Sequence, residues 1–192
     1  MFINDWKKDV FTLPNMLSFL RLMLIPVYVV IYLNAAEQPD YFLSGGILAV
    51  SCLTDMIDGQ IARRFNMVST LGKILDPVAD KLTQLSLTIC LSIKYPLLRL
   101  VLGLIILKES FQCIAGIAHL RKGKMLDGAL PAGKVCTGVL FVSLIVLVVL
   151  PDLNPGLVNI IAITDLVFLS YSFLNYILAY FGNSPKVQDL KE

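Results

Sequence analysis

The sequence has few charged residues, and it lacks the cysteine or histidine spacing of a disulfide scaffold or a zinc site. Of its 192 residues 16% are charged and 57% are hydrophobic, whereas soluble domains have about 25% and roughly 45–50%. The four cysteines are scattered through apolar stretches without a CxxC pair, and there is one histidine. This composition excludes a disordered chain and a disulfide scaffold, and it argues against a water-soluble globule.

Six long and mostly apolar stretches are present instead. A membrane-spanning helix needs about 20 such residues, and each stretch reaches or approaches that length. We therefore expect an all-α fold, an integral membrane bundle of six transmembrane helices that forms a single domain over residues 1–192. A short amphipathic helix around Trp6, lying in the membrane interface, is a further expectation. The expected spans are Met16–Leu33, Tyr41–Gln60, Lys73–Lys94, Leu97–Leu120, Pro131–Leu150 and Leu157–Phe181.

The basic residues lie on alternate connections between these stretches. Lys7 and Lys8 precede the first span, Arg63 and Arg64 follow the second, and a basic run from Arg121 follows the fourth. The connections 34–40 and 151–156 contain no lysine or arginine. Cytoplasmic loops carry an excess of such residues. The pattern predicts a multi-pass protein of the cell membrane with both termini on the cytoplasmic side.

Four aspartates interrupt the second and third apolar stretches. Asp55 and Asp58 are three residues apart, and Asp76 and Asp80 are four apart, so each pair projects from one face of a helix. A short turn joins the two helices, which must therefore run antiparallel and bring both pairs together at the cytoplasmic end. Ionisable groups at membrane depth are expensive and mark candidate functional sites.

Four carboxylates in one pocket cannot all be ionised unless something neutralises them. Protonation, as in a proton carrier, is one solution, and bound cations are the other. Oxygen ligands without histidine or cysteine favour hard ions such as Mg²⁺ or Mn²⁺, and Gly59 and Gly72 leave the backbone open to a bulky ligand. The structural alternative is a set of interfacial salt bridges with Arg63, Arg64, Lys73 and Lys81.

The aspartate segment resembles a family signature. The pattern Asp55-x2-Asp58-Gly59-x2-Ala62-Arg63-x8-Gly72-x3-Asp76-x3-Asp80 has all eight fixed positions of the CDP-alcohol phosphatidyltransferases. The LPNMLSFLR run from Leu13 and the LDPVADK run from Leu75 look most like bacterial phosphatidylglycerophosphate synthases, and eukaryotic-type cardiolipin synthases share both runs.

This resemblance implies transfer of a phosphatidyl group from CDP-diacylglycerol to an alcohol acceptor, with glycerol-3-phosphate first among the candidates, giving phosphatidylglycerophosphate and CMP. It implies two Mg²⁺ or Mn²⁺ ions, a cytoplasmic active site, a homodimer in the lipid membrane and no nucleic-acid partner. By motif position, Asp80 is the catalytic base, the metal ligands are Asp55, Asp58, Asp76 and Asp80, and the CDP-binding residues are Asp58, Gly59, Ala62, Arg63 and Gly72.

Acceptor recognition is assigned to basic residues within the other spans, namely Arg21, Lys108 and Lys134. A phosphorylated acceptor needs such cations, which are costly in a membrane unless they are paired or functional. Snorkelling to the surface is the alternative for Arg21 and Lys134, and an internal pair with Glu109 or Asp165 is the alternative for Lys108. The resemblance leads us to expect Arg-Glu where this chain has Lys108-Glu109, so phosphatidylglycerol and inositol phosphate also stay open as acceptors.

A cation-coupled membrane transporter is the alternative from a different class. Transporters place their sites near the bilayer midplane, between repeated halves. In this sequence the acids gather at one end of the predicted helices and no repeat is visible, which favours the transferase.

Overall fold

The structure is a computed structural model of the chain, and it describes residues 13–64, 72–121, 124–126, 130–182 and 187–189. For residues 52–64 and a few further positions it describes the backbone alone. The expected interfacial helix around Trp6 lies outside the described residues. Contacts divide the chain into two compact units: unit 1 comprises Met1–Cys90 with Ile145–Asp152, and unit 2 comprises Leu91–Leu144 with Leu153–Glu192. The expectation of a single domain stays a prediction.

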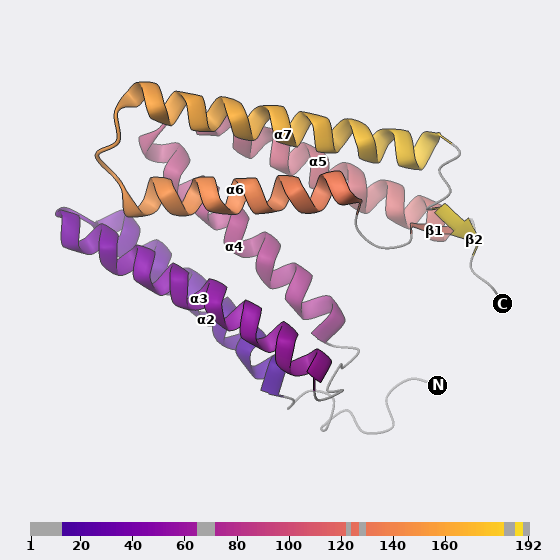
Figure 1. Cartoon of the computed structure of the whole chain (residues 1–192), viewed down its shortest axis with the longest axis horizontal. Helices are drawn as coiled ribbons and strands as arrows, with labels where there is room; N and C mark the ends of the chain where they lie inside the picture. The colour runs from indigo at the N-terminus through magenta and orange to yellow at the C-terminus, as the bar shows by residue number, and fades with distance from the viewer. Residues whose placement is uncertain (1–12, 65–71, 122–123, 127–129, 183–186, 190–192) are drawn as a thin grey trace. The chain divides into compact units, whose positions relative to one another are not determined.

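Six helices make up most of the described part of the chain (Figure 1). Each coincides with one of the expected spans, and the bounds differ by at most four residues. The helical fold is therefore confirmed. The helices are α2 (Leu13–Asn34), α3 (Gln38–Arg64), α4 (Gly72–Lys94), α5 (Leu98–Leu120), α6 (Pro131–Val149) and α7 (Pro155–Phe181).

Four of these helices are long and apolar enough to cross a membrane: α2 over Asn15–Asn34, and α5, α6 and α7 over their full lengths. Large apolar side chains such as Met23, Ile114 and Leu178 are exposed along them, as expected of helices in contact with lipid tails. The protein is thus a multi-pass membrane protein. Helices α3 and α4, whose sequences hold the aspartate motif, are not among the four, so the count of six spans stays a prediction.

In unit 1, α2 and α3 pack against each other as two helices joined by a three-residue link (Figure 1). Asp40 closes this link, because its Oδ2 accepts hydrogen bonds from the backbone N–H groups of Ala36 at 3.0 Å and Glu37 at 3.3 Å. The rings of Tyr32 and Tyr41 meet edge to face at 5.5 Å between centroids. The link and the aromatic pair fix the end of the hairpin remote from the aspartate motif.

Helices α2 and α4 run parallel within unit 1. Ser18, Arg21 and Tyr28 of α2 contact partners on α4 that lie 58, 59 and 58 residues further along the chain, and the Tyr28 hydroxyl also donates to the Thr83 carbonyl, 55 residues further, at 3.4 Å. A nearly constant separation requires two helices that advance in the same direction. The Tyr28 hydroxyl donates to Ser86 Oγ at 2.6 Å, while the Ser86 hydroxyl donates to the Leu82 carbonyl of its own helix, also at 2.6 Å.

In unit 2, aromatic side chains join α5 to α7, which pack against each other. The Phe111 ring of α5 meets Phe173 at 5.4 Å and Tyr180 at 6.1 Å, both edge to face. Asn154 caps the start of α7, because its side-chain oxygen accepts from the Gly156 N–H at 2.8 Å and Pro155 fills the first helical position.

Unit 2 also contains a short strand pair that the sequence analysis did not predict. Strands β1 (Lys124–Leu126) and β2 (Val187–Asp189) pair antiparallel, with Met125 opposite Gln188. A three-residue strand is too short to show the alternation by which strands are recognised in a sequence. The pair ties the segment after α5 to the segment after α7.

We predict that Tyr28→Phe lowers the free energy of unfolding by about 1 kcal/mol or less. The substitution removes the hydrogen bond of the Tyr28 hydroxyl to Ser86 Oγ and its weaker one, at 3.4 Å, to the Thr83 carbonyl. It leaves no donor without an acceptor, because the Ser86 hydroxyl still donates to its own helix. Thermal unfolding of the purified protein in detergent micelles measures the effect. A loss of several kcal/mol would contradict this account of the α2–α4 contact.

Candidate active site

The start of α2 buries a row of polar side chains. Asn15, Ser18 and Arg21 are spaced by three residues, and their exposed fractions are 1%, 0% and 2%. This spacing puts all three on one face of the helix. A buried guanidinium is costly unless it has a partner, so this face requires an acceptor opposite it.

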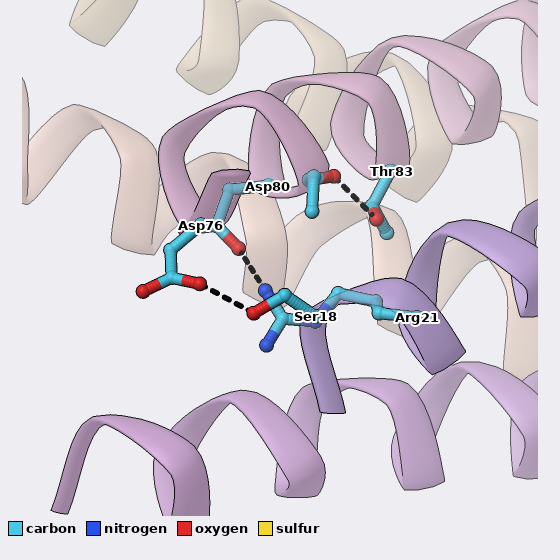
Figure 2. Close-up of polar contacts among 6 residues, drawn as sticks. Ser18, Arg21, Asp76, Asp80 and Thr83 are labelled. Carbon is cyan, nitrogen blue, oxygen red and sulfur yellow. Dashed lines mark hydrogen bonds and ion pairs between the residues drawn. The ribbon is translucent and has the colours of Figure 1, made fainter. Parts of the chain in front are cut away.

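Helix α4 supplies that acceptor with two carboxylates one turn apart. Figure 2 shows Asp76 and Asp80 directed from α4 toward α2. The Ser18 hydroxyl donates to Asp76 Oδ1, and Arg21 Nη1 donates to Asp80 Oδ1 at 2.7 Å. Hydrogen bonds to a carboxylate are among the stronger ones in proteins. The Asp80 side chain is nevertheless 42% exposed, so the Arg21–Asp80 ion pair joins a buried guanidinium to a carboxylate that stays partly accessible.

The other two predicted aspartates belong to α3, and the structure describes only their backbone. Ser44, Leu48 and Ser51 form the buried row of α3, and positions 55 and 58 continue that row in steps of four and three along a helix that is unbroken to Arg64. The side chains of Asp55 and Asp58 lie outside the described residues, as do those of Ala62 and Arg63. Their roles therefore stay predictions.

The described acids suit a hard divalent ion. Asp76 and Asp80 offer only carboxylate oxygens, the ligands that Mg²⁺ and Mn²⁺ prefer, and Mg²⁺ keeps part of its shell for water and substrate phosphate. The first residue of α4, Gly72, is buried. Within the described residues no group of three or more potential ligands occurs; the side chains of two of the four predicted ligands, Asp55 and Asp58, lie outside them.

A second buried cation lies in unit 2. Lys108 is 6% exposed, its Nζ lies 2.9 Å from Glu109 Oε1, and it lies 5.7 Å from the centre of the Tyr176 ring. The ion pair with Glu109, one of the alternatives that the sequence left open, is thus present. Lys134, by contrast, is exposed. Because Arg21 belongs to unit 1 and both lysines to unit 2, a joint role of the three in acceptor binding stays a prediction.

Comparison with known families decides the class of protein. Residues 11–171 match the family model described as CDP-alcohol phosphatidyltransferase. The chain belongs to this family. The matched stretch contains both the α2 and α4 residues that meet in Figure 2, and it confirms the resemblance stated from the aspartate motif. Members of this family act on a CDP-alcohol and an alcohol acceptor at the membrane, and they generally depend on a divalent metal.

Individual relatives carry two kinds of name. A probable phosphatidylglycerophosphate synthase of Mycobacterium tuberculosis is 34% identical over 148 residues, which cover 74% of this chain and 68% of that protein. A CDP-diacylglycerol–glycerol-3-phosphate 3-phosphatidyltransferase of Rickettsia typhi is 40% identical over 80 residues, which cover 41% of this chain and 44% of the relative. A probable cardiolipin synthase (CMP-forming) of Drosophila melanogaster is 37% identical over 117 residues, which cover 59% of this chain and 34% of that protein. The aligned part of the chain thus spans less than half of the length of the last two.

The contacts of Ser18 and Arg21 with the acid pair were not predicted from the sequence. The sequence does contain one indication of them: Ser18 and Arg21 lie about one helical turn apart, and so do Asp76 and Asp80. That signal identifies two faces but not that they meet. Only the parallel packing of α2 on α4 brings them together.

We predict that Gly133→Ala destabilises unit 2, whereas Gly138→Ala on the same helix does not. A Cβ at Gly133 would lie 2.6 Å from the Tyr176 hydroxyl oxygen, while none of the atoms around Gly138 would lie within 4 Å of its Cβ. Overpacking of this kind costs about 1–3 kcal/mol, and it would shift the ring over which Lys108 lies. Thermal unfolding of the two variants in micelles measures the difference. Equal midpoints would show that the Gly133–Tyr176 contact is not tight.

Proposed function

We propose that this protein transfers the phosphatidyl group of CDP-diacylglycerol to glycerol-3-phosphate, giving phosphatidylglycerophosphate and CMP. The observation that carries the proposal is the pair of carboxylates one turn apart on α4, Asp76 and Asp80, which accept hydrogen bonds from buried donors of α2 within the family-matched stretch. The names of the mycobacterial and rickettsial relatives support this acceptor.

The reaction is a displacement at phosphorus. The hydroxyl oxygen of the acceptor forms a bond to the lipid-bearing phosphorus, the anhydride bond to CMP breaks, and CMP leaves with that electron pair. Asp80 takes the proton of the attacking hydroxyl, as a carboxylate within hydrogen-bond reach can. Its partly exposed side chain supports this role. Released CMP, the new phosphodiester and the proton taken by Asp80 account for all atoms of both substrates.

The metal and nucleotide sites follow the motif. We propose that Asp55, Asp58, Asp76 and Asp80 hold two Mg²⁺ or Mn²⁺ ions, and that Asp58, Gly59, Ala62, Arg63 and Gly72 contact the CDP moiety. Such ions, when bound, stabilise charge on the phosphate oxygens. The buried position of Gly72 at the start of α4 suits close approach of a nucleotide to the backbone.

For the acceptor phosphate we propose the basic residues Lys108 and Lys134; Arg21, the third residue assigned from the sequence, is buried against Asp80. For Lys108 this role competes with the pair to Glu109. Phosphatidylglycerol, the acceptor of a cardiolipin synthase, is the second candidate because the Drosophila relative bears that name. Inositol phosphate stays the third. Family membership favours all three over a cation-coupled transporter.

We further propose that the protein is a homodimer in the cell membrane, with both termini and the active site on the cytoplasmic side. The orientation rests on the distribution of lysine and arginine in the sequence, and the dimer rests on the family resemblance alone. Glycerol-3-phosphate is water-soluble and CDP-diacylglycerol is a lipid, so a site at the membrane surface gives access to both.

The test of the proposed function is CMP release by the purified protein in mixed micelles with CDP-diacylglycerol and Mg²⁺. Glycerol-3-phosphate, phosphatidylglycerol and inositol phosphate are supplied in separate reactions. We expect release with glycerol-3-phosphate, and loss of release in EDTA that excess Mg²⁺ or Mn²⁺ reverses. Release with phosphatidylglycerol alone would move the assignment to cardiolipin synthesis. No CMP with any acceptor would defeat the transferase proposal.

We predict that Asp80→Asn lowers CMP release by at least about 100-fold, the usual contribution of a general base, while the protein still folds. Asp40→Asn is the matched control, since Asp40 is a carboxylate of the same unit whose contacts are to the backbone before α3; we expect its activity to stay within about twofold of wild type. Circular dichroism and thermal unfolding verify the fold. Near-normal turnover of Asp80→Asn would remove Asp80 as the base.

A further inference from the structure

The polar face of α2 engages the acid pair and not the surrounding medium. Ser18 is fully buried and Arg21 is 2% exposed, and both point to α4 in Figure 2. Each donates to one oxygen of one aspartate, Ser18 to Asp76 Oδ1 and Arg21 to Asp80 Oδ1 at 2.7 Å. The two donors are about one turn apart on α2 and the two acceptors one turn apart on α4, so successive turns of the two helices each contribute one contact.

These contacts restrict how the carboxylates can turn. An aspartate side chain rotates about two bonds, and a fixed partner on one oxygen selects one orientation for the other oxygen. Figure 2 shows the second oxygen of Asp76 directed away from Ser18. The Ser18 and Arg21 contacts lie on adjacent turns and act on the acids directly, whereas the Tyr28–Ser86 contact joins the same two helices further along, away from the acids. The orientation of the acid pair is therefore fixed by α2.

Burial also distinguishes this role from direct recognition of the acceptor. A residue that binds a water-soluble phosphate needs a side chain that the phosphate can reach, whereas Arg21 is almost completely covered and its Nη1 is already engaged by Asp80. Binding the acceptor would require Arg21 to leave a charged partner in a buried setting, which is costly.

We propose that Ser18 and Arg21 are positioning residues, which act through Asp76 and Asp80 and set the orientation in which the two carboxylates bind their divalent ion. This inference rests on the proposed function, since it takes Asp76 and Asp80 as ligands. Partners of metal-ligating carboxylates fix the ligand geometry, and their loss typically weakens metal binding by roughly 10- to 100-fold.

Ser18→Ala gives the sharper test, because it removes a hydrogen bond without changing any charge. Binding of Mn²⁺ to the purified protein in micelles is measured by electron paramagnetic resonance, which needs no turnover. We expect the dissociation constant to rise roughly 10- to 100-fold in Ser18→Ala and to recover largely in Ser18→Thr, which retains the hydroxyl. Tyr28→Phe is the matched control, since it removes a hydrogen bond between the same two helices away from the acids; its Mn²⁺ affinity should not change.

Arg21→Lys separates positioning from acceptor binding while it preserves the charge. A lysine cannot reproduce the planar fork of arginine at a carboxylate. Positioning predicts a fall in kcat of about tenfold or more with the KM for glycerol-3-phosphate unchanged. A raised KM at unchanged kcat would assign Arg21 to the acceptor and overturn its part of the proposal.

The outcomes separate this inference from the proposed function. Unchanged Mn²⁺ affinity in Ser18→Ala, an equal loss in Tyr28→Phe, or no Mn²⁺ binding by the wild type would overturn the positioning role. Thermal unfolding identifies any variant that fails to fold. If Ser18→Ala does not fold, Ser18→Thr is tested instead: because it keeps the hydroxyl, its Mn²⁺ affinity must be close to that of the wild type, and a large loss would overturn the role of Ser18. If the wild type binds Mn²⁺ but releases no CMP with any acceptor, the proposed reaction fails while the metal-binding arm still decides the role of Ser18.

Discussion

The interaction on which unit 1 depends is the pairing of the α4 carboxylates with the polar face of α2. An acid on a helix that faces apolar surroundings is tolerated only if it has a partner or an outlet to water, and Asp76 and Asp80 each have a partner on α2. Arg21 is equally constrained, because a guanidinium that is 2% exposed requires an anion. The Arg21–Asp80 pair, 2.7 Å long, therefore requires α2 and α4 to lie together, and the Ser18 and Tyr28 contacts with α4 show that they do so in parallel.

The pairing belongs to a wider pattern in unit 1, whose interior holds many polar side chains beside its apolar ones, while large apolar side chains are exposed on its helices. The buried positions of α2, α3 and α4 include asparagine, serine, threonine, glutamine and arginine, whereas residues such as Met23 and Val50 face outward. Such an arrangement suits a lipid environment, where apolar surface gives no reason to turn inward and polar side chains hold helices together. It also explains why α3 and α4 are less apolar than the four helices able to span a membrane.

Much of the fold could be predicted because it depends on local patterns. Apolar length located all six helices of the described chain, Pro131 and Pro155 begin α6 and α7 as helix-starting residues do, and the fixed spacing from Asp55 to Asp80 identified the family. Strands β1 and β2 could not be predicted, since three residues show no period and their pairing joins segments about 60 positions apart. The Lys108–Glu109 pair was one of several alternatives, because a lysine side chain reaches many neighbours.

The sequence alone determined the helical class, the family and the identity of the four acids, because hydropathy and motif spacing are written along the chain. Only the tertiary structure decided what two of those acids, Asp76 and Asp80, touch. Ser18 meets Asp76, and Arg21 meets Asp80, across 58 and 59 residues of intervening chain. No periodicity specifies such contacts, since they depend on which helix faces pack and in which register. For Arg21 this distinction is decisive: the sequence indicates a costly cation in a membrane span, and its burial against Asp80 indicates the partner that makes it tolerable.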